Sequence, residues 1–455
     1  MSTPLPHTPA PPRTLNIAVI GAGIAGVTTA FELAADGHRV TVYDRRESVG
    51  AEGSFANTGL LSPGCVSPAS APGLRPWLLR GLVGHESALR WRPGASLAQW
   101  RWLARWWRAC GTSHAADVRT LVGLARYSQQ RLALLTEQLE LDYERSSGVL
   151  LLLRDEREFR PSRRHVLMLR ELGVEAAELT PEQCREIEPG LGEDAVLAGG
   201  VHLSGDGVGN CRQFAYQLRD AAVASGRVSF RFDTAVQSVR PEGSQVHLRL
   251  APAGPDPAWQ TQTSKTAPLA DQPAVAHDAV VLCTGASAGA LLKPLGWSLP
   301  LLPVYGHSLT LPLRLDGRAP RSAVVDAQAG VAIGRLGGRI RITGGYGLGE
   351  VGAEPSEEAL RPLYAALDRW FPYAANRNQV QVWTGARPML PEGPPIIGSA
   401  PGTAGTVWLN VGHGAHGWTL ACGSARLLAD QLGGRTTALD ASPFAAVRWL
   451  RKGRR

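Results

Sequence analysis

The hydrophobic positions of this chain follow two different patterns, which meet near residue 299. Up to that point, short unbroken apolar runs alternate with stretches whose apolar residues recur at helical spacing. Such runs are typical of strands buried on both faces of a parallel sheet, and the stretches between them are typical of amphipathic helices. Over residues 299–383, apolar and polar positions alternate instead, which is typical of an antiparallel sheet with one covered face. The pattern therefore predicts two architectures in one chain.

The expected strands cover residues 17–20, 39–43, 147–154, 228–232, 236–239, 246–250, 278–282, 305–311, 331–335, 339–346 and 407–411. Four of the expected helices cover residues 116–139, 155–172, 211–224 and 356–370, and Asn210 is the expected N-cap of the third. Another helix begins at the first glycine-rich turn and ends at Gly37. The last one follows the last strand and ends at residue 432. The glycine-rich residues 189–210 are expected to form a loop. Residues 251–276 are rich in Pro, Gln, Thr and Ala, and we expect a flexible hairpin insertion without function there.

The first turn has a recognisable glycine spacing. Gly21, Gly23 and Gly26 follow the apolar run directly, as G-x-G-x-x-G. The first glycine allows the tight turn, the second lets the backbone approach a pyrophosphate, and the third lets the helix pack on the strand. The helix N-terminus then offers free N–H groups to the phosphates. The next strand ends at Asp44, whose carboxylate can accept hydrogen bonds from a ribose. Together these features predict a dinucleotide-binding βαβ unit, which leaves NAD and FAD open.

A second strand, glycine-rich turn and helix follow near the C-terminus. The turn reads Gly-His-Gly-Ala-His-Gly-Trp-Thr over residues 412–419 and aims another helix N-terminus at an anion or an electron-rich ring. A flavin offers such a target at its N1/O2 edge, where negative charge accumulates on reduction. This second helix N-terminus favours FAD over NAD. The small residues and amides of 52–64 suit a loop against a flat ring, although a plain surface loop is the competing interpretation.

Residues 76–110 are rich in tryptophan and arginine. On a helix, one face would carry Trp100, Leu103, Trp106, Trp107 and Cys110, and another would carry Arg101, Arg105 and Arg108. Such a helix can pack on its own domain or lie in a membrane interface. The sequence leaves both interpretations open.

Composition excludes several classes of protein. A hydrophobic content of 44% with 19% charged residues describes an ordinary globular protein, and no apolar run approaches the roughly 18 residues of a membrane-spanning helix. The six cysteines are scattered without a C-x-x-C pair, which predicts reduced thiols and neither a metal site nor a disulfide framework. Residues 1–12 are rich in proline and lack a signal-peptide core, so we expect a disordered tail and a cytoplasmic protein. The net charge of +8 favours acidic partners, but no nucleic-acid-binding motif accompanies it, so nucleic acid is not expected.

In these motifs the chain resembles the small subunit of D-amino acid dehydrogenases, within the amino-acid oxidase superfamily that includes glycine and sarcosine oxidases. The resemblance covers residues 17 to about 439 and rests on residues 21–26 (GAGIAG), 54–64 (SFANTGLLSPG), 308–310 (SLT), 383–388 (WTGARP) and 412–419 (GHGAHGWT). It implies non-covalent FAD, oxidation of a D-amino acid to its imino acid, and hydrolysis to a 2-oxo acid and ammonia. It also implies electron transfer to a membrane quinone pool or another acceptor, hence a cytoplasmic location that includes peripheral contact with the inner face of the cell membrane.

The chain departs from the family on the substrate side. The family usually has Lys-Gly-Tyr-Ser where this chain has Tyr305-Gly-His307-Ser308, and a common tyrosine aligns with Ala329. His416 stands where an apolar residue is usual. These departures leave the substrate side chain open and make a ring amine such as D-hydroxyproline a credible alternative.

Oxidation of an amino acid by a flavin mainly requires orientation, with Cα–H against N5 and a neutral amine. A guanidinium is the best partner for the substrate carboxylate because it donates two parallel hydrogen bonds. We expect Arg335, at a strand end of the second sheet, and Arg387, in the segment that returns to FAD, in this role. Tyr305, His307, Tyr346 and His416 are the further catalytic candidates, although a structural role competes for any single histidine or tyrosine. The expected FAD-binding residues are Ile20, Gly21, Ala22, Gly23, Ile24, Ala25, Gly26, Asp44, Arg45, Asn57, Thr58, Gly59, Val236, Thr284, Gly285, Gly412, His413, Gly414, Gly417, Trp418 and Thr419.

The predicted fold is an α/β FAD-binding Rossmann-like domain of the glutathione-reductase type, joined to an α+β substrate domain with an antiparallel sheet. Residues 13–65, 203–299 and 384–455 are assigned to the first domain, and residues 66–202 and 300–383 to the second. Two other classes of function stay open. One is an oxygen-using amino-acid, glycine or sarcosine oxidase, and the other is a non-catalytic FAD-binding subunit of a complex. A homo- or hetero-oligomer is compatible with the sequence.

Overall fold

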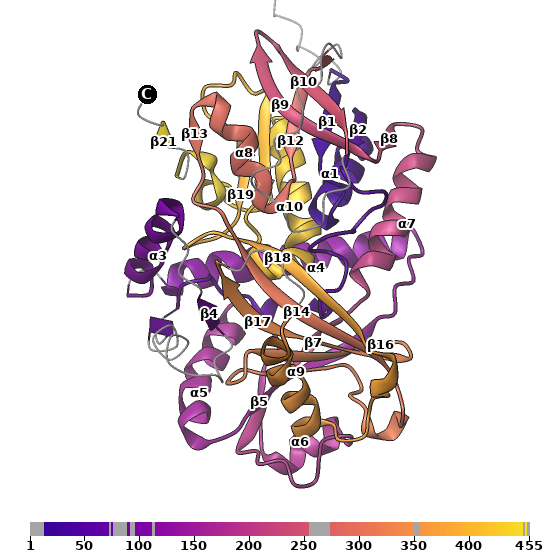
Figure 1. The fold of residues 1–455 in the computed structure, drawn as a ribbon, viewed down its shortest axis with the longest axis vertical. Helices are drawn as coiled ribbons and strands as arrows, with labels where there is room; N and C mark the ends of the chain where they lie inside the picture. Colours follow the sequence, from indigo (N-terminus) through magenta and orange to yellow (C-terminus); the bar gives the residue numbers. More distant parts are fainter. Residues whose placement is uncertain are drawn as a thin grey trace, which may run out of the picture.

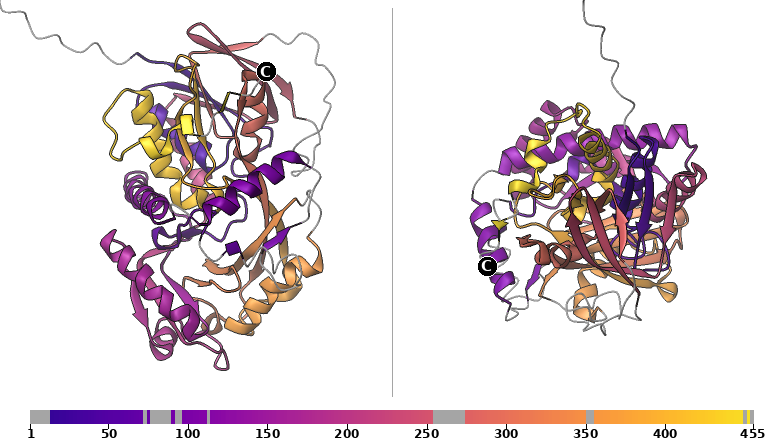
Figure 2. Two further views of the ribbon diagram at one scale, coloured as in Figure 1. Left: turned by 90° about the vertical axis from the view of Figure 1, so that its left-hand side faces the viewer. Right: turned by 90° about the horizontal axis from the view of Figure 1, so that it is seen from above.

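The computed structural model describes residues 13–71, 74–75, 89–91, 96–111, 114–253, 274–349, 355–448 and 451–452. Figures 1 and 2 show a region with the parallel sheet at one end and a second sheet with its helices at the other. The expected tail at 1–12 and most of the expected insertion lie outside the described residues. The described ends of that insertion belong to β10 (Gln245–Pro252) and β11 (Val275–His277), which pair with each other.

The first region is built on a six-stranded sheet in the order β19-β20-β12-β1-β2-β8. Its strands are β1 (Asn16–Ile20), β2 (Arg39–Tyr43), β8 (Val228–Arg231), β12 (Ala279–Leu282), β19 (Ile396–Ser399) and β20 (Val407–Val411). The strand pairs are parallel except for the edge strand β19. The apolar runs of the sequence thus form a central parallel sheet covered on both faces, and the Rossmann-like prediction is confirmed.

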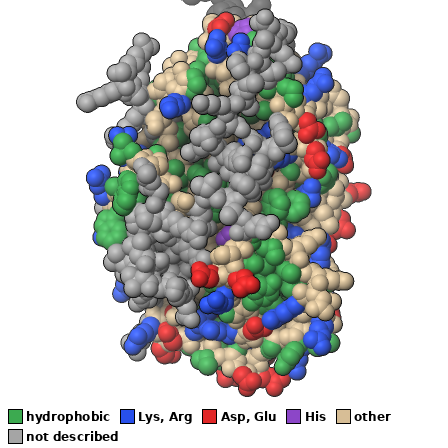
Figure 3. All heavy atoms as spheres, in the orientation of Figure 1, with side chains coloured by type: hydrophobic (Ala, Val, Ile, Leu, Met, Phe, Trp, Pro, Cys, Tyr) green, Lys and Arg blue, Asp and Glu red, His purple; other side chains and the backbone are tan. Residues whose placement is uncertain are grey.

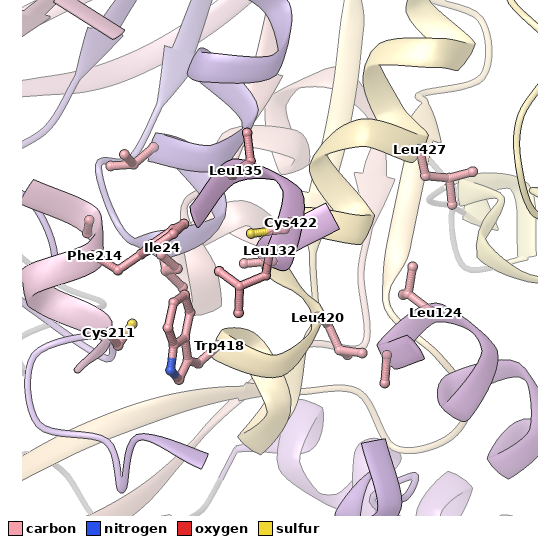
Figure 4. Close-up of a cluster of buried hydrophobic side chains, with 14 of the residues drawn as sticks. Ile24, Leu124, Leu132, Leu135, Cys211, Phe214, Trp418, Leu420, Cys422 and Leu427 are labelled. Atoms are coloured by element: carbon pink, nitrogen blue, oxygen red, sulfur yellow. The ribbon is translucent and has the colours of Figure 1, made fainter. Parts of the chain in front are cut away.

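The two faces of this sheet bury alternate residues of the same strands. Ile17 and Val19 of β1 belong to the core under the helices α1 (Ile24–Ala35), α4 (His114–Gln138), α7 (Cys211–Ala224) and α10 (Gly417–Leu432). Ala18 and Ile20 belong to the opposite core, with β10, β9 (Thr234–Glu242) and α8 (Ala288–Leu292). Figure 4 shows side chains of α1, α4, α7 and α10 around Trp418, whose ring lies 4.9 Å from that of Phe214. Helices from distant parts of the chain therefore share one core.

A buried ion cluster joins three of these helices. Glu32 of α1 is fully buried, and its carboxylate accepts hydrogen bonds from Arg131 of α4 at 2.6 and 2.9 Å. Arg426 of α10 donates to the same carboxylate at 2.8 Å and to Asp36 at 2.6 Å. Because the charges neutralise one another, α1, α4 and α10 are held at a fixed spacing beneath the sheet.

The second region contains a ten-stranded mixed sheet whose main path is β18-β14-β17-β16-β15-β5-β7-β3. These strands are β18 (Gln381–Met389), β14 (Leu302–Pro312), β17 (Arg339–Leu348), β16 (Val331–Leu336), β15 (Ala323–Asp326), β5 (Ser146–Leu153), β7 (Gly199–Val208) and β3 (Leu60–Leu61). Short strands β4 (Leu89–Trp91) and β6 (Ala177–Leu179) pair with β17 and β7. Helix α9 (Glu357–Trp370) packs on this sheet, whereas α5 (Glu156–Glu171) and α6 (Pro181–Ile187) lie against β7. A second, mainly antiparallel architecture is thus present.

One local prediction was wrong, and a second was confirmed only in part. The expected loop at 189–210 contains the ten-residue strand β7, which pairs with β5 on one edge and with β3 and β6 on the other. At α3 (Leu97–Ala109), Trp106 and Cys110 of the expected apolar face are buried, but Trp102 is buried with them and Trp100 is 49% exposed. The indole N–H groups of Trp102 and Trp106 donate to the carbonyl oxygens of Met389 and Ala69, which selects that face for burial.

The division into two domains stays a prediction. Sheet membership crosses its expected boundaries at three strands of the ten-stranded sheet: β3 lies in a segment assigned to the FAD-binding domain, and β7 and β18 end in such segments. No helix in the described part of the chain is long and apolar enough to cross a membrane.

Candidate active site

A cavity of about 710 Å³ lies between the two sheets, at the carboxyl ends of the parallel strands. Crevices at this edge of open α/β sheets are where such folds bind their ligands. Its walls include Ile20, Gly21, Gly23, Ile24, Ala25, Asp44, Arg45, Asn57, Thr58, Gly59, Val236, Thr284, Gly285, Gly412, His413, Gly414, Gly417, Trp418 and Thr419. Of the residues expected to bind FAD, only Ala22 and Gly26 do not line this cavity. The structure therefore brings together segments that are widely separated in sequence.

The first glycine-rich turn forms one wall of the cavity. Gly21 has φ of +103°, and a Cβ there would lie 2.6 Å from the carbonyl oxygen of Cys283. A Cβ on Gly26 would lie 1.8 Å from the carbonyl oxygen of Gly21, so Gly26 lets α1 pack on the turn without contacting the cavity itself. The N–H of Ile24 at the start of α1 donates to Ser54 Oγ at 3.1 Å. The helix N-terminus thus opens into the cavity beside a hydroxyl.

Asp44 ends β2 at the same wall. Its carboxylate accepts hydrogen bonds from the N–H of Ala22 at 2.5 Å and from that of Arg46 at 2.7 Å. Burial raises the pKa of Asp44, and the two N–H donors oppose that shift. Ala22 therefore orients the carboxylate and does not line the cavity. Arg45 and Arg46, at the edge of the same wall, both donate to Glu52 Oε1, at 2.9 and 2.8 Å.

The second glycine-rich turn leads into α10 on the far side of the cavity. His413 is buried and its Nε2 lies 3.1 Å from Ser424 Oγ, and burial lowers the pKa of His413 to about 4. His413 is therefore neutral at physiological pH. Thr419 Oγ1 donates to the carbonyl oxygen of Leu60 at 3.0 Å, which ties the start of α10 to β3. Two helix N-termini, those of α1 and α10, thus open into one cavity.

Four buried polar atoms on the cavity walls have no hydrogen-bond partner among the described residues. They are Thr284 Oγ1, Asn410 Oδ1, Ser308 Oγ and Trp383 Nε1. A buried polar atom without a partner costs about 1–3 kcal/mol, so these atoms indicate a polar ligand in the cavity. Sequence reasoning assigned no role to the last three. Asn410 was detectable as a polar residue at the end of a buried strand, and Ser308 and Trp383 stand in the stretches that carry the resemblance.

Arg387 of β18 lies at the end of the cavity formed by the second sheet. Its NH1 donates to the carbonyl oxygen of Gly345 at 2.5 Å, and its guanidinium carbon lies 4.6 Å from the centre of the Tyr346 ring. The group also lies across Gly306, where a Cβ would come within 2.4–2.6 Å of its NH2, Cζ and NH1 atoms. Within the described residues, no carboxylate forms an ion pair with Arg387. The cavity therefore contains a cation that is held in place and that no described carboxylate neutralises.

Two histidines line the same end of the cavity. His307 Nδ1 lies 3.0 Å from Thr384 Oγ1, on the neighbouring strand. His416 Nε2 contacts the backbone N–H and carbonyl oxygen of Ser67, at 3.2 and 3.1 Å. Burial, followed by the charge of Arg387, lowers the pKa of His416 to about 4. His416 is thus a neutral group, and Arg387 carries the positive charge at this end.

Two expected substrate residues lie elsewhere. On β16, Ile333 faces the core under α9, and Gly334 faces Thr58 of the loop formed by residues 52–64. Because side chains alternate along a strand, Arg335 points away from the loop, and its NH2 binds Asp316 Oδ1 at 2.6 Å. Tyr305 is buried and does not line the cavity. The structure thus corrects the placement of Arg335 and Tyr305, while Arg387, His307, Tyr346 and His416 all line the cavity.

Comparison with protein families gives one match that covers most of the chain. Residues 16–431 match the family model described as FAD dependent oxidoreductase. A D-amino acid dehydrogenase of Cereibacter sphaeroides is 38% identical over 445 residues, which is 97% of each chain. A D-amino acid dehydrogenase of Rhodopseudomonas palustris is 37% identical over 443 residues, covering 96% of this chain and 98% of its own.

Solved structures share the fold at lower identity. Glycine oxidase from Geobacillus kaustophilus superposes with a TM-score of 0.70 at 24% identity, covering 95% of this chain and 98% of its own. L-proline dehydrogenase from P. horikoshii gives a TM-score of 0.68 at 19% identity, covering 96% and 98%. These neighbours show that the chain shares their overall fold.

Proposed function

Because the chain belongs to the family of FAD-dependent oxidoreductases, we propose that it oxidises D-amino acids to imino acids, which hydrolyse to 2-oxo acids and ammonia. The relatives named D-amino acid dehydrogenase are similar to it over nearly their whole length, which supports this substrate class. The observation that carries the proposal is Arg387, a cation on the cavity wall that is fixed by the protein and lacks an ion-pair partner among the described residues.

The cavity residues fit FAD. Two helix N-termini are available to the pyrophosphate and to the electron-rich edge of the ring, and Asp44 stands where a ribose hydroxyl can donate. The unpartnered Thr284 Oγ1 and Asn410 Oδ1 are further groups that the cofactor can satisfy. We propose that these residues and the other cavity-lining members of the expected set hold FAD. When bound, the flavin accepts the two electrons and the hydrogen that leave the substrate Cα.

Substrate orientation is the task of the opposite wall. Arg387 donates NH1 to Gly345, and its remaining N–H groups are directed to the substrate carboxylate in this proposal. His307, Tyr346 and His416 surround the remainder of the substrate. Because His416 stays neutral, it accepts or donates a hydrogen bond without adding a second charge near the amine.

The electron acceptor and any membrane contact are finer parts of the proposal. Trp100 and Trp107 of α3 are 49% and 38% exposed, and Arg101 and Arg108 belong to the same helix. In Figure 3, hydrophobic side chains gather at the left edge, where Figure 1 draws α3. A basic helix with exposed tryptophans supports peripheral contact with an anionic membrane. In this proposal a quinone in that membrane takes the electrons from the flavin.

An anaerobic flavin-bleaching assay tests the proposal. The purified yellow holoenzyme is mixed with a panel of D- and L-amino acids, D-hydroxyproline and sarcosine, and the flavin absorbance is followed. We expect bleaching by D-amino acids and not by their L-forms. Readmission of oxygen or addition of a quinone analogue then identifies the acceptor. Absence of bleaching with every compound would refute the enzyme assignment and favour a non-catalytic FAD-binding subunit.

Two arginine variants test the site. Arg387→Ala should keep FAD but weaken substrate binding by about 3 kcal/mol, or roughly 100-fold, because the carboxylate loses its charged partner. Arg335→Ala is the matched control, since its guanidinium is paired with Asp316 outside the cavity, and it should leave the substrate affinity unchanged. Equal effects of the two substitutions would contradict the assignment of Arg387.

A further inference from the structure

We propose that Gly306 is a positioning residue, because the Arg387 guanidinium occupies the space that a side chain at position 306 would fill. The inference rests on the proposed function, in which Arg387 binds the substrate carboxylate. It adds a residue that acts through Arg387, and it explains why a glycine stands in the middle of β14, between β18 and β17.

The contact is between neighbouring strands. Gly306 of β14 pairs with Gly385 of β18, so Arg387 lies two residues further along the neighbouring strand. A Cβ built on Gly306 would lie 2.4 Å from NH2, 2.5 Å from Cζ and 2.6 Å from NH1 of Arg387. All three atoms belong to the planar end of the side chain, so the guanidinium lies flat over the glycine.

Two further contacts fix the same group. The Gly345 carbonyl oxygen accepts from NH1 at 2.5 Å, and the Tyr346 ring lies 4.6 Å from the guanidinium carbon. Both residues belong to β17, the other neighbour of β14. The guanidinium is thus supported from below by Gly306 and anchored by β17. A planar donor binds a carboxylate with two parallel hydrogen bonds only in one orientation, so these supports determine the substrate pose.

Substitution of Gly306 should move the arginine and leave the fold intact. The backbone of Gly306 is not in the left-handed region, so alanine is compatible with it. The atoms that a methyl group would displace are the far end of a flexible side chain, and no backbone atom is among the three nearest. Alanine should therefore displace the guanidinium from its position over residue 306. A displacement of about 1 Å in a positioning group can cost on the order of 100-fold in reaction efficiency.

The experiment compares Gly306→Ala with wild type in the holoenzyme, using the D-amino acid that bleaches the flavin fastest. We expect KM to rise by about 10- to 100-fold with a much smaller change in kcat. FAD content and the thermal unfolding midpoint should stay near those of wild type. Gly338→Ala is the matched control, because a Cβ at Gly338 meets nothing within 4 Å. It should change neither parameter.

A double variant separates positioning from a general structural effect. In an Arg387→Ala background the displaced atoms are gone, so Gly306→Ala should add no further increase in KM. If Gly306→Ala alone fails to fold, the double variant should recover folded, FAD-containing protein for the same reason. An increase in KM that persists in the Arg387→Ala background would overturn the inference.

The remaining outcomes distinguish this inference from the proposed function. An unchanged KM in Gly306→Ala, with a raised KM in Arg387→Ala, would overturn the inference that Gly306 positions Arg387 and would leave the proposed function unaffected. An unchanged KM in both variants would instead overturn the role of Arg387 itself, and with it the inference.

Discussion

Removal of the Glu32 charge should destabilise the protein far more than removal of a surface carboxylate. The Glu32 side chain has no exposed surface, and it accepts hydrogen bonds from Arg131 at 2.6 and 2.9 Å and from Arg426 at 2.8 Å. In Glu32→Gln the shape is kept but the charge is lost. Arg131, whose side chain is 21% exposed, then loses its carboxylate partner.

The magnitude follows from which charges are left behind. Breaking a buried pair by removing one partner costs about 3–5 kcal/mol. Arg426 retains Asp36 and Asp430, at 2.6 and 3.0 Å, and Arg131 reaches solvent in part, so we expect the lower end, about 3 kcal/mol. This is a large fraction of a typical unfolding free energy of about 5–15 kcal/mol.

The assay is urea unfolding of the FAD-saturated protein, followed by far-ultraviolet circular dichroism. Asp368→Asn is the control, because Asp368 pairs with Arg377 on an exposed helix face, and its loss should cost less than about 1 kcal/mol. Added salt should weaken the control pair and leave the Glu32 effect nearly unchanged. Similar losses of stability in the two variants would refute the reasoning that the buried cluster holds the three helices together.

Two further predictions concern the cofactor site. Gly26→Ala should abolish or severely weaken FAD binding, because its Cβ would lie 1.8 Å from the Gly21 carbonyl oxygen and force α1 off the turn; titration of the apoprotein with FAD measures this, and wild-type affinity would contradict it. His413 should make the free energy of unfolding depend on pH. Its folded pKa is lowered to about 4, below the ordinary 6.5, so the unfolded state binds more protons between these values. Stability is then full above pH 6.5 and is lost as pH falls toward 4, by up to about 3 kcal/mol. Unfolding curves across this window should show a flatter dependence in His413→Gln, and an equal slope would contradict the prediction.

Local patterns predicted the features that depend on local chemistry. The apolar run of β1, the glycine spacing after it and the acid at the end of β2 each indicate their role within a few residues, and the N-cap Asn210 starts its helix as expected. These features fold in the same way wherever the strands lie. The FAD-binding architecture was therefore accessible from sequence.

Features set by non-local pairing were not accessible. The residues of β7 contain four glycines and read as a loop, but pairing on both edges makes them a strand. Arg335 and Arg387 both stand near strand ends. Whether each side chain faces the cavity depends on how its strand pairs with its neighbours, and the local sequence does not determine that pairing. The burial of Trp102 in α3 was missed for a similar reason, since its indole N–H donates to the carbonyl oxygen of Met389, which is far away in sequence.

The order of strands in the parallel sheet has a consequence for the synthesis of the protein. On one side, β1 pairs with β12, which pairs in turn with β20, and α10 then covers α1. Strand β1 is thus synthesised long before its neighbour from residues 279–282, and β20, which ends at residue 411, follows later still. At about 5–20 residues per second, this takes roughly 20 to 80 seconds, during which apolar strands lack their partners. Nascent chains therefore depend on protection from aggregation, and cofactor uptake follows translation.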